Sequence, residues 1–183
     1  YGEEWGYRHR ARLSVRFVEG KGGALVGFRE KRSTYVADMR GCEVLPPRIS
    51  SLIVPLRNLI GRLSIRDRVP QIEIAVGETA TVLLFRHLLP FSPDDNALLR
   101  EFAATQAVHV WLQSAGPETV APFHPVASDA LFYDLPEFGV RIAFQPCDFT
   151  QVNPAINRLL VSRAVRLLDP RPGERIADLF CGI

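Results

Sequence analysis

The sequence predicts a mixed α/β protein, in which a central α+β module over residues 1–145 precedes the start of a second α/β domain over residues 146–183. Two observations predict this class. Up to residue 145, segments with alternating apolar residues are interspersed with segments of helical spacing. After residue 145, a helical pattern, a Pro/Gly connection and a short apolar run ending in Cys181-Gly182 follow in that order. That order is how the first unit of a doubly wound α/β domain begins.

The first strand is expected from Arg10 to Val18, where apolar and polar residues alternate. Its apolar side chains point one way and its cationic side chains the other. The cationic set is Arg10, Arg12 and Arg16. Side chains two positions apart on a strand are separated by roughly 6.5–7 Å, which is close to the phosphate spacing of a nucleic-acid strand. The residues alone leave two interpretations open, a nucleic-acid contact and a solvated arginine face.

The rest of the central module is expected to alternate between strands and helices. A glycine-rich turn over 19–23 should return the chain antiparallel to the first strand, so that the first three strands form a meander. Pro55 should kink or restart the first long helix. Residues 116–138 are interpreted as a long connection rich in proline and polar residues. The expected strands cover 24–29, 34–39, 71–76, 79–86, 109–112 and 140–144, and the expected helices cover 48–63 and 93–105.

The last third of the chain begins with a helix start. Asn153 can cap the helix, and Pro154 suits its first position, where a missing N–H costs nothing. Apolar residues then recur at helical spacing up to Leu168, which predicts a helix with one buried face. Residues 169–173 stop the helix, and 175–180 are expected to form a buried strand.

Composition indicates a globular chain without a membrane partner. The apolar content is 47% and the mean hydropathy is +0.05. No apolar run approaches the length of a membrane span, and the first residues lack signal-peptide design, so a cytoplasmic location is expected. The chain begins at Tyr1 and ends at Ile183 inside an expected glycine-rich turn, so we expect an internal fragment of a longer protein.

Charge and cysteine usage narrow the function classes. A formal charge of +2 is too small to indicate a nucleic-acid partner by itself, but the arginines cluster near the start, and the 22 cationic residues include only two lysines. Three cysteines without a CxxC pair make neither a disulfide framework nor a complete metal site. Cys42 alone is therefore compatible with a small buried apolar residue. His87, His109 and His124 lack ligand spacing and are expected to be structural or on the surface.

Four motifs together resemble one family. Residues 149–153 (Phe-Thr-Gln-Val-Asn) are followed after a single helix by residues 178–182 (Asp-Leu-Phe-Cys-Gly), and residues 5–14 and a lone Cys42 lie upstream. This order is similar to that of the S-adenosylmethionine-dependent RNA uracil-C5 methyltransferases, and most similar to the bacterial 23S rRNA enzymes of the RlmD type. The resemblance implies that the second domain is a Rossmann-like methyltransferase domain.

The resemblance also implies site residues. Gln151 and Phe180 match contacts to S-adenosylmethionine, Phe149 matches the aromatic residue beside the target base, and Arg12 matches a position close to the target nucleotide. Cys42 matches the fourth thiolate of a 4Fe-4S cluster, whose other three ligands lie upstream of this chain. The implied partner is 23S rRNA, and we expect a monomer.

The chemistry that the resemblance implies is methyl transfer to C5 of a uridine through a covalent cysteine adduct. The family carries the nucleophilic cysteine and the general base downstream of residues 178–182, so we expect neither in this chain. Cys181 does not match the nucleophile, and Cys147 matches no fixed position. Three alternatives stay open: an enzyme of the same superfamily that modifies tRNA or another rRNA site, a non-catalytic RNA-binding module, and a redox sensor built around the cluster.

Overall fold

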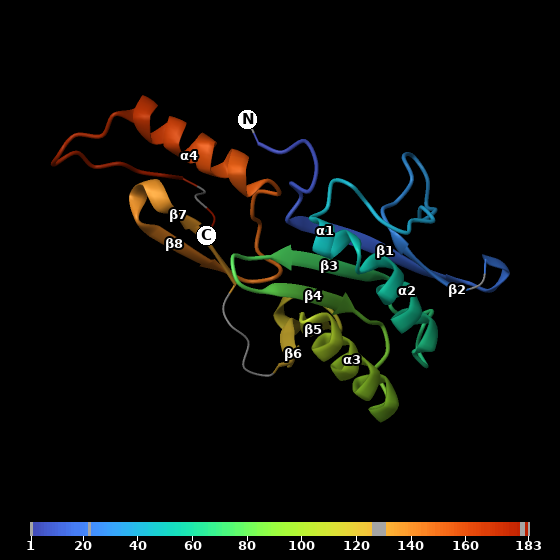
Figure 1. The fold of residues 1–183 in the computed structure, drawn as a ribbon. Helices are drawn as coiled ribbons and strands as arrows, with labels where there is room; N and C mark the ends of the chain where they lie inside the picture. Colours follow the sequence, from blue (N-terminus) through green and yellow to red (C-terminus); the bar gives the residue numbers. More distant parts are fainter. Residues whose placement is uncertain (1, 22, 126–130, 180–181, 183) are drawn as a thin grey trace.

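The structure, a computed structural model, describes residues 2–21, 23–125, 131–179 and 182. It contains a six-stranded sheet and a two-stranded hairpin, with helices on one face of the sheet and beside the hairpin (Figure 1). The mixed α/β class predicted from the sequence is confirmed. The strands are β1 (Arg10–Val18), β2 (Gly23–Gly27), β3 (Gln71–Val76), β4 (Thr81–Arg86), β5 (His109–Gln113), β6 (Ala121–His124), β7 (Leu131–Leu135) and β8 (Val140–Phe144). The helices are α1 (Pro47–Ser50), α2 (Ile53–Arg62), α3 (Pro93–Gln106) and α4 (Pro154–Leu168), with short 3-10 helices η1 (Glu19–Lys21), η2 (Pro117–Thr119) and η3 (Pro136–Phe138).

The six-stranded sheet has the order β2-β1-β3-β4-β5-β6. β1 pairs antiparallel with β2 and β3, which confirms the predicted turn after Val18. β4 and β5 are parallel and are connected through α3. The alternation of β1 puts Leu13 on the helix-covered face and Arg12 on the opposite face. The hydrophobic core lies between the sheet and α1, α2 and α3, and its residues Leu13, Ile72 and Phe85 are fully buried.

The start of α3 is fixed by a capping box. The Ser92 hydroxyl accepts a hydrogen bond from the Asp95 backbone N–H, and the Asp95 carboxylate accepts one from the Ser92 N–H. Asp95 is buried and also accepts from the backbone N–H and the hydroxyl of Ser64, at 2.7 and 2.5 Å. Burial favours a higher pKa for Asp95, but the hydrogen bonds from Ser64 and Ser92 outweigh it and hold the pKa below its ordinary value.

Two expectations about the central module are wrong. Residues 34–39 form no strand, only an isolated bridge between Val36 and Arg29. The Ala37 N–H donates to the Phe28 carbonyl and the Glu30 N–H to the Tyr35 carbonyl, so the pairing with the chain after β2 is limited to this bridge. Further along, the Met39 carbonyl accepts from the Arg57 side chain of α2. The predicted three-strand meander therefore stops at two strands, and β3 is the second neighbour of β1.

Residues 116–138 are not a simple connection. β6 pairs antiparallel with β5 through an irregular register, and β7 pairs with β8 through the η3 turn, where Gly139 adopts a left-handed φ of 62°. The proline content of this segment had suggested a loop, but its prolines lie at an edge strand and in turns, where a missing N–H is tolerated.

The predicted helix over 48–63 is two helices. α1 ends at Ser50 and α2 begins at Ile53, so Pro55 lies in the first turn of α2, where its missing N–H interrupts nothing. The predicted restart is confirmed. No helix in the described ranges combines the length and the hydropathy that crossing a bilayer requires.

α4 is confirmed as a helix, but its predicted buried apolar face is not. Ser162 is the buried residue of α4, whereas Leu159, Leu160 and Leu167 are exposed. The face toward the hairpin is polar: Arg158, Ser162 and Arg166 lie four residues apart, and Arg166 pairs with Glu137 at 2.9 Å.

The expected strand over 175–180 is also absent over its described part. Residues 174–178 have no regular structure, because a strand needs a neighbour to pair with and none of the described strands pairs with them.

Candidate functional site

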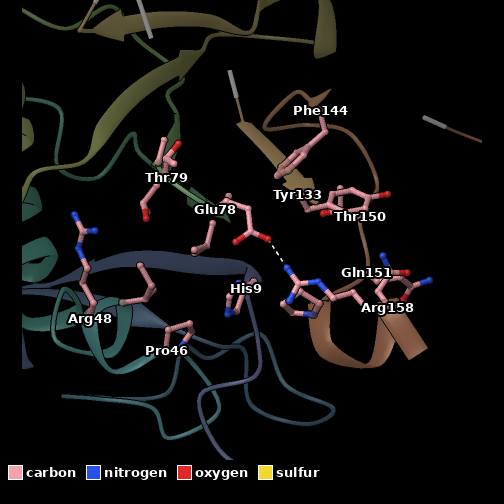
Figure 2. Close-up of a pocket in the computed structure, with 17 residues that line it drawn as sticks. His9, Pro46, Arg48, Glu78, Thr79, Tyr133, Phe144, Thr150, Gln151 and Arg158 are labelled. Atoms are coloured by element: carbon pink, nitrogen blue, oxygen red, sulfur yellow. Dashed lines mark hydrogen bonds and ion pairs between the residues drawn. The ribbon is translucent and has the colours of Figure 1, made fainter. Parts of the chain in front are cut away.

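A cavity of about 330 Å³ opens where β1, α1, the β3–β4 turn, the hairpin and the start of α4 meet (Figure 2). Its walls come from segments far apart in the sequence, and its polar side chains include His9, Glu78, Thr150, Gln151 and Arg158. Because each wall belongs to a different element, the shape of this cavity depends on how α4 and the hairpin are held against the sheet.

The loop over 145–153, which carries the Phe-Thr-Gln motif, is anchored at both ends. At its start, Gln145 and Asp148 form a turn: the Gln145 N–H donates to the Asp148 carboxylate at 2.6 Å. At its end, Asn153 caps α4 by accepting from the Ile156 N–H at 3.1 Å, as predicted. The His9 N–H donates to the Val152 carbonyl at 2.8 Å, which joins the loop to the residue before β1.

The two predicted site residues of this loop are brought together. Phe149 is 80% exposed, and Gln151 is also exposed. Both line a second cavity of about 240 Å³, together with Tyr133, Asp148 and Gly182. Gln151 and Thr150 line both cavities, so the two spaces adjoin at the motif. An exposed aromatic ring and a free amide beside connected cavities are suited to stacking on, and hydrogen bonding to, a polar aromatic ligand.

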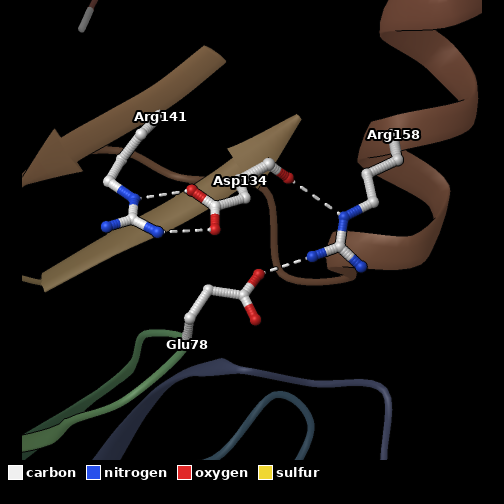
Figure 3. A network of polar contacts seen from close by, with 4 residues as sticks. All are labelled: Glu78, Asp134, Arg141 and Arg158. Atoms are coloured by element: carbon white, nitrogen blue, oxygen red, sulfur yellow. Dashed lines mark hydrogen bonds and ion pairs between the residues drawn. The ribbon is translucent and has the colours of Figure 1, made fainter. Parts of the chain in front are cut away.

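A charged network holds α4 to the rest of the structure (Figure 3). Arg158 of α4 donates to the Glu78 carboxylate in the β3–β4 turn and, at 3.1 Å, to the Asp134 carbonyl in β7. The Asp134 carboxylate accepts two hydrogen bonds from Arg141, at 2.8 and 3.0 Å. The bonds from Arg141 lower the pKa of Asp134 and raise the pKa of Arg141.

His9 lies beside this network. Burial lowers the pKa of His9, Glu78 acts in the opposite direction, and Arg158 lowers it further. In the sequence, His9 stands out only as part of the motif over 5–14, and nothing marks Glu78 or Arg158 as a site residue. No periodic pattern identifies them, because their role comes from tertiary proximity. The one feature of the sequence that could have indicated them is that each is a polar residue next to the start of an element or in a turn: His9 before β1, Glu78 in the β3–β4 turn and Arg158 near the start of α4.

The predicted cationic face of β1 is less uniform than the alternation suggested. Arg12 is 68% exposed but pairs with Glu73 of β3 at 3.0 Å. Arg10 is half-buried, and burial lowers the pKa of its guanidinium. Glu73, Cys147 and Asp148 act in the opposite direction on the pKa of Arg10, so this end of β1 lies near the loop that carries Phe149. Of the three arginines, Arg16 alone is both exposed and without an ion pair in the described part of the chain.

Cys42 is half-buried at the edge of the core, and its N–H donates to the Ser50 hydroxyl at 2.8 Å. Across the described ranges, no group of three or more His, Cys, Asp or Glu side chains could hold a metal ion. Cys147 is exposed. The prediction for Phe180 lies outside the described residues, as does the one for Cys181.

Comparison with known proteins identifies curated relatives at high identity. The chain is 64% identical to the 23S rRNA (uracil(1939)-C(5))-methyltransferase RlmD of Thiobacillus denitrificans, 62% to that of Burkholderia pseudomallei and 60% to that of Aromatoleum aromaticum. Each match covers all 183 residues of this chain but only 39–42% of the relative. The chain thus spans about two fifths of the length of these relatives. No family model matches.

Among solved structures, the chain is similar to the Pyrococcus abyssi tRNA (uracil-54, C5)-methyltransferase in complex with S-adenosyl-L-homocysteine. The TM-score is 0.62 at 17% identity, over 90% of this chain and 42% of that one. At this identity the likeness concerns the fold alone. The curated relatives confirm the resemblance: along its whole length the chain is homologous to part of the RlmD-type RNA uracil-C5 methyltransferases.

Proposed function

We propose that the full-length protein containing this chain is an S-adenosylmethionine-dependent methyltransferase that methylates C5 of a uridine in 23S rRNA. The observation that carries the proposal is the 60–64% identity, over every residue of this chain, to relatives named for that reaction. We extend the proposal to a cytoplasmic monomer whose RNA-binding module covers 1–145 and whose methyltransferase domain begins at 146.

The residues around the Phe-Thr-Gln loop fit a methyl donor. S-adenosylmethionine has polar amino-acid and ribose groups, and the cavity of about 240 Å³ is lined by the Gln151 amide and the Asp148 carboxylate. S-adenosylmethionine would supply the methyl group. We assign Gln151 to binding this cofactor, and Phe180 to the same role from the family motif.

We assign Phe149 and Arg12 to the RNA side. The exposed Phe149 ring offers a face on which an unstacked base can lie, which is how proteins commonly hold single-stranded RNA. Arg12 keeps most of its side chain in solvent while Glu73 orients it, so it can contact a phosphate or a base edge. The nucleophilic cysteine and the general base would come from sequence outside this chain.

The described residues supply only part of the ligand set that a 4Fe-4S cluster needs. Such a cluster is held by four thiolates, and Cys42 is the one cysteine at the expected place, with Cys147 exposed elsewhere. We propose that Cys42 is one ligand and that the other three lie in sequence before Tyr1. No step of the proposed reaction is assigned to the cluster.

The test is methyl transfer by the full-length protein, purified without oxygen, from labelled S-adenosylmethionine to unmodified 23S rRNA. We expect methylation of a single uridine at C5. Gln151→Ala should raise the apparent dissociation constant for the cofactor, whereas Gln145→Ala, an exposed glutamine of the same loop, should not. Loss of visible cluster absorbance in Cys42→Ser would support the ligand assignment, and unchanged absorbance would refute it.

A second candidate substrate is tRNA, because the solved structure that this chain resembles is named as a tRNA (uracil-54, C5)-methyltransferase. Its 17% identity, against 60–64% for the 23S rRNA relatives, makes it the weaker candidate. Methylation of unmodified tRNA, with none of 23S rRNA, would keep the chemistry and change the substrate.

A further inference from the structure

An arginine groove lies along the second half of β1, from Ser14 to Phe17. The groove has a volume of about 390 Å³ and brings together Arg16 of β1, Arg29 after β2 and Arg66 in the segment before β3. We propose that this arginine groove binds the phosphate backbone of the RNA substrate. The proposal rests on the RNA methyltransferase function proposed above and adds a contact surface remote from the Phe-Thr-Gln loop.

The groove carries positive charge that the protein itself does not neutralise. Arg16, Arg29 and Arg66 are exposed, and within the described ranges none has a carboxylate oxygen within 4.0 Å. The single acidic lining residue, Asp67, pairs with Arg68 at 3.3 Å. Like charges placed together repel one another, so this arrangement is stabilised by an anion that bridges them.

Another arginine-lined groove in the same chain is built differently. Arg40, Arg57 and Arg62 line a groove on α2, on the helix-covered side of the sheet. There Arg57 pairs with Asp38 at 2.6 Å, and Arg62 lies 3.9 Å from Glu101. Arginine content alone therefore does not explain the unpaired cluster, since two of the three arginines of the groove on α2 have carboxylate partners, and only Arg40 has none within the described ranges.

Neighbouring side chains orient the guanidinium groups of Arg29 and Arg66 and leave most of their N–H groups available as hydrogen-bond donors. Arg66 lies over the Phe17 ring, 4.5 Å from its centre, and stacking of this kind leaves the in-plane N–H groups available. Arg29 has one long contact, from Nε to the Ser14 hydroxyl at 3.4 Å. The planar fork of arginine can then donate two hydrogen bonds to one phosphate.

The position of the arginine groove suits a strand of RNA that also reaches the predicted site. β1 begins beside the Phe-Thr-Gln loop, where His9 bonds to Val152, and runs away from α4 toward the β1–β2 turn (Figure 1). Arg12 and Arg16 share one face of β1 and are separated by about 13 Å along the strand. An RNA strand with its target base beside Phe149 can therefore follow β1 past Arg12 to the arginine groove.

The experiment measures binding of 23S rRNA fragments to the full-length protein across a salt series. The variant Arg16→Ala/Arg29→Ala removes two charges from the arginine groove. Arg40→Ala/Arg62→Ala removes two charges from the groove on α2 and is the matched control. Arg16→Lys/Arg29→Lys keeps the charge and tests folding, because it should restore most of the binding.

We expect Arg16→Ala/Arg29→Ala to raise the dissociation constant about tenfold at 0.1 M salt and to reduce the slope of log K against log salt by about 1.4. The control should change both values by much less. Equal effects of the two alanine variants would overturn the proposal, because a general loss of charge would then explain the result. Wild-type protein that neither binds nor methylates RNA would instead refute the proposed function.

Discussion

The sheet with α1, α2 and α3 and the helix α4 are held in place by different forces, and the hairpin between them packs Leu131 and Phe144 against Ala75 and Val82 of the sheet. In the first region, apolar side chains such as Leu13, Ile53 and Phe85 are completely buried in one continuous core. In the second, α4 contacts the hairpin and the sheet through Arg158 and Arg166, while its leucines stay exposed. Burial of apolar area is a large contribution that salt does not screen, whereas exposed ion pairs contribute little and are screened by salt.

This difference indicates that the two regions have different tasks. The sheet, with its continuous core, is the scaffold that positions β1 and its arginines. α4 and the loop before it are an attachment point, whose polar side contacts the scaffold and whose apolar side is open. Since the relatives extend well beyond the region matched here, we propose that their additional sequence covers the apolar side of α4.

The largest effect is expected for Phe85→Ala in the core. Phe85 is fully buried in β4, so truncation removes its apolar contacts and leaves a cavity. We expect a loss of about 3–5 kcal/mol in the free energy of unfolding, measured by urea denaturation. A loss below about 1 kcal/mol would mean that the core is loosely packed and would weaken the comparison.

A smaller effect is expected for Asp95→Asn at the start of α3. The buried carboxylate accepts hydrogen bonds from Ser64 and Ser92, so the substitution should cost about 1–3 kcal/mol near neutral pH.

The same residue predicts a pH dependence. Because the folded-state pKa of Asp95 lies below its ordinary value, its contribution is complete above that ordinary value and is lost as the pH falls through the folded-state pKa. Urea denaturation at several pH values should show that the difference between wild type and Asp95→Asn shrinks below about pH 4. A difference that does not vary with pH would contradict this account.

Arg158→Ala should change local motion more than global stability. The Arg158 and Glu78 side chains are 42% and 36% exposed, so we expect a loss of no more than about 1 kcal/mol, which salt reduces further. Hydrogen exchange should rise in α4 and in the hairpin but not in β3. Raised exchange across the whole sheet would show that the two regions are not separable.

The smallest effect is expected for Leu167→Ala on α4. Leu167 is 76% exposed, so its truncation in residues 1–183 should change stability by less than about 0.5 kcal/mol. In the full-length protein the same substitution should cost more, if further sequence covers this face. Equal small values in both proteins, obtained by thermal denaturation, would argue against that covering.

The sequence predicted the elements whose partners lie close along the chain. β1 and its turn into β2 follow from alternation and glycine, and the starts of α3 and α4 follow from Ser92 and Asn153 as caps. The strand predicted over 34–39 was wrong: its pairing with residues 28–30 extends only over one bridge, and beyond it the Met39 carbonyl accepts from Arg57 of another element. Local alternation cannot reveal such a competitor, since it arises only when the chain is folded.

The sequence likewise predicted the site residues that belong to one local motif, but not those brought together by folding. The motif indicated Phe149 and Gln151, which the structure places on one cavity. It could not indicate His9, Glu78 and Arg158, because they come from three elements that meet only in the folded protein. Alternation likewise treated Arg12 and Arg16 as equivalent, whereas Glu73 distinguishes them by pairing with Arg12.

The most direct test of the central claim is the modification state of 23S rRNA in cells. We would delete the gene that encodes this chain and map 5-methyluridine in 23S rRNA by mass spectrometry, with re-expression of the full-length protein as the control. The account predicts that one 5-methyluridine disappears and returns on re-expression. An unchanged set of 5-methyluridines in 23S rRNA would contradict the proposed function.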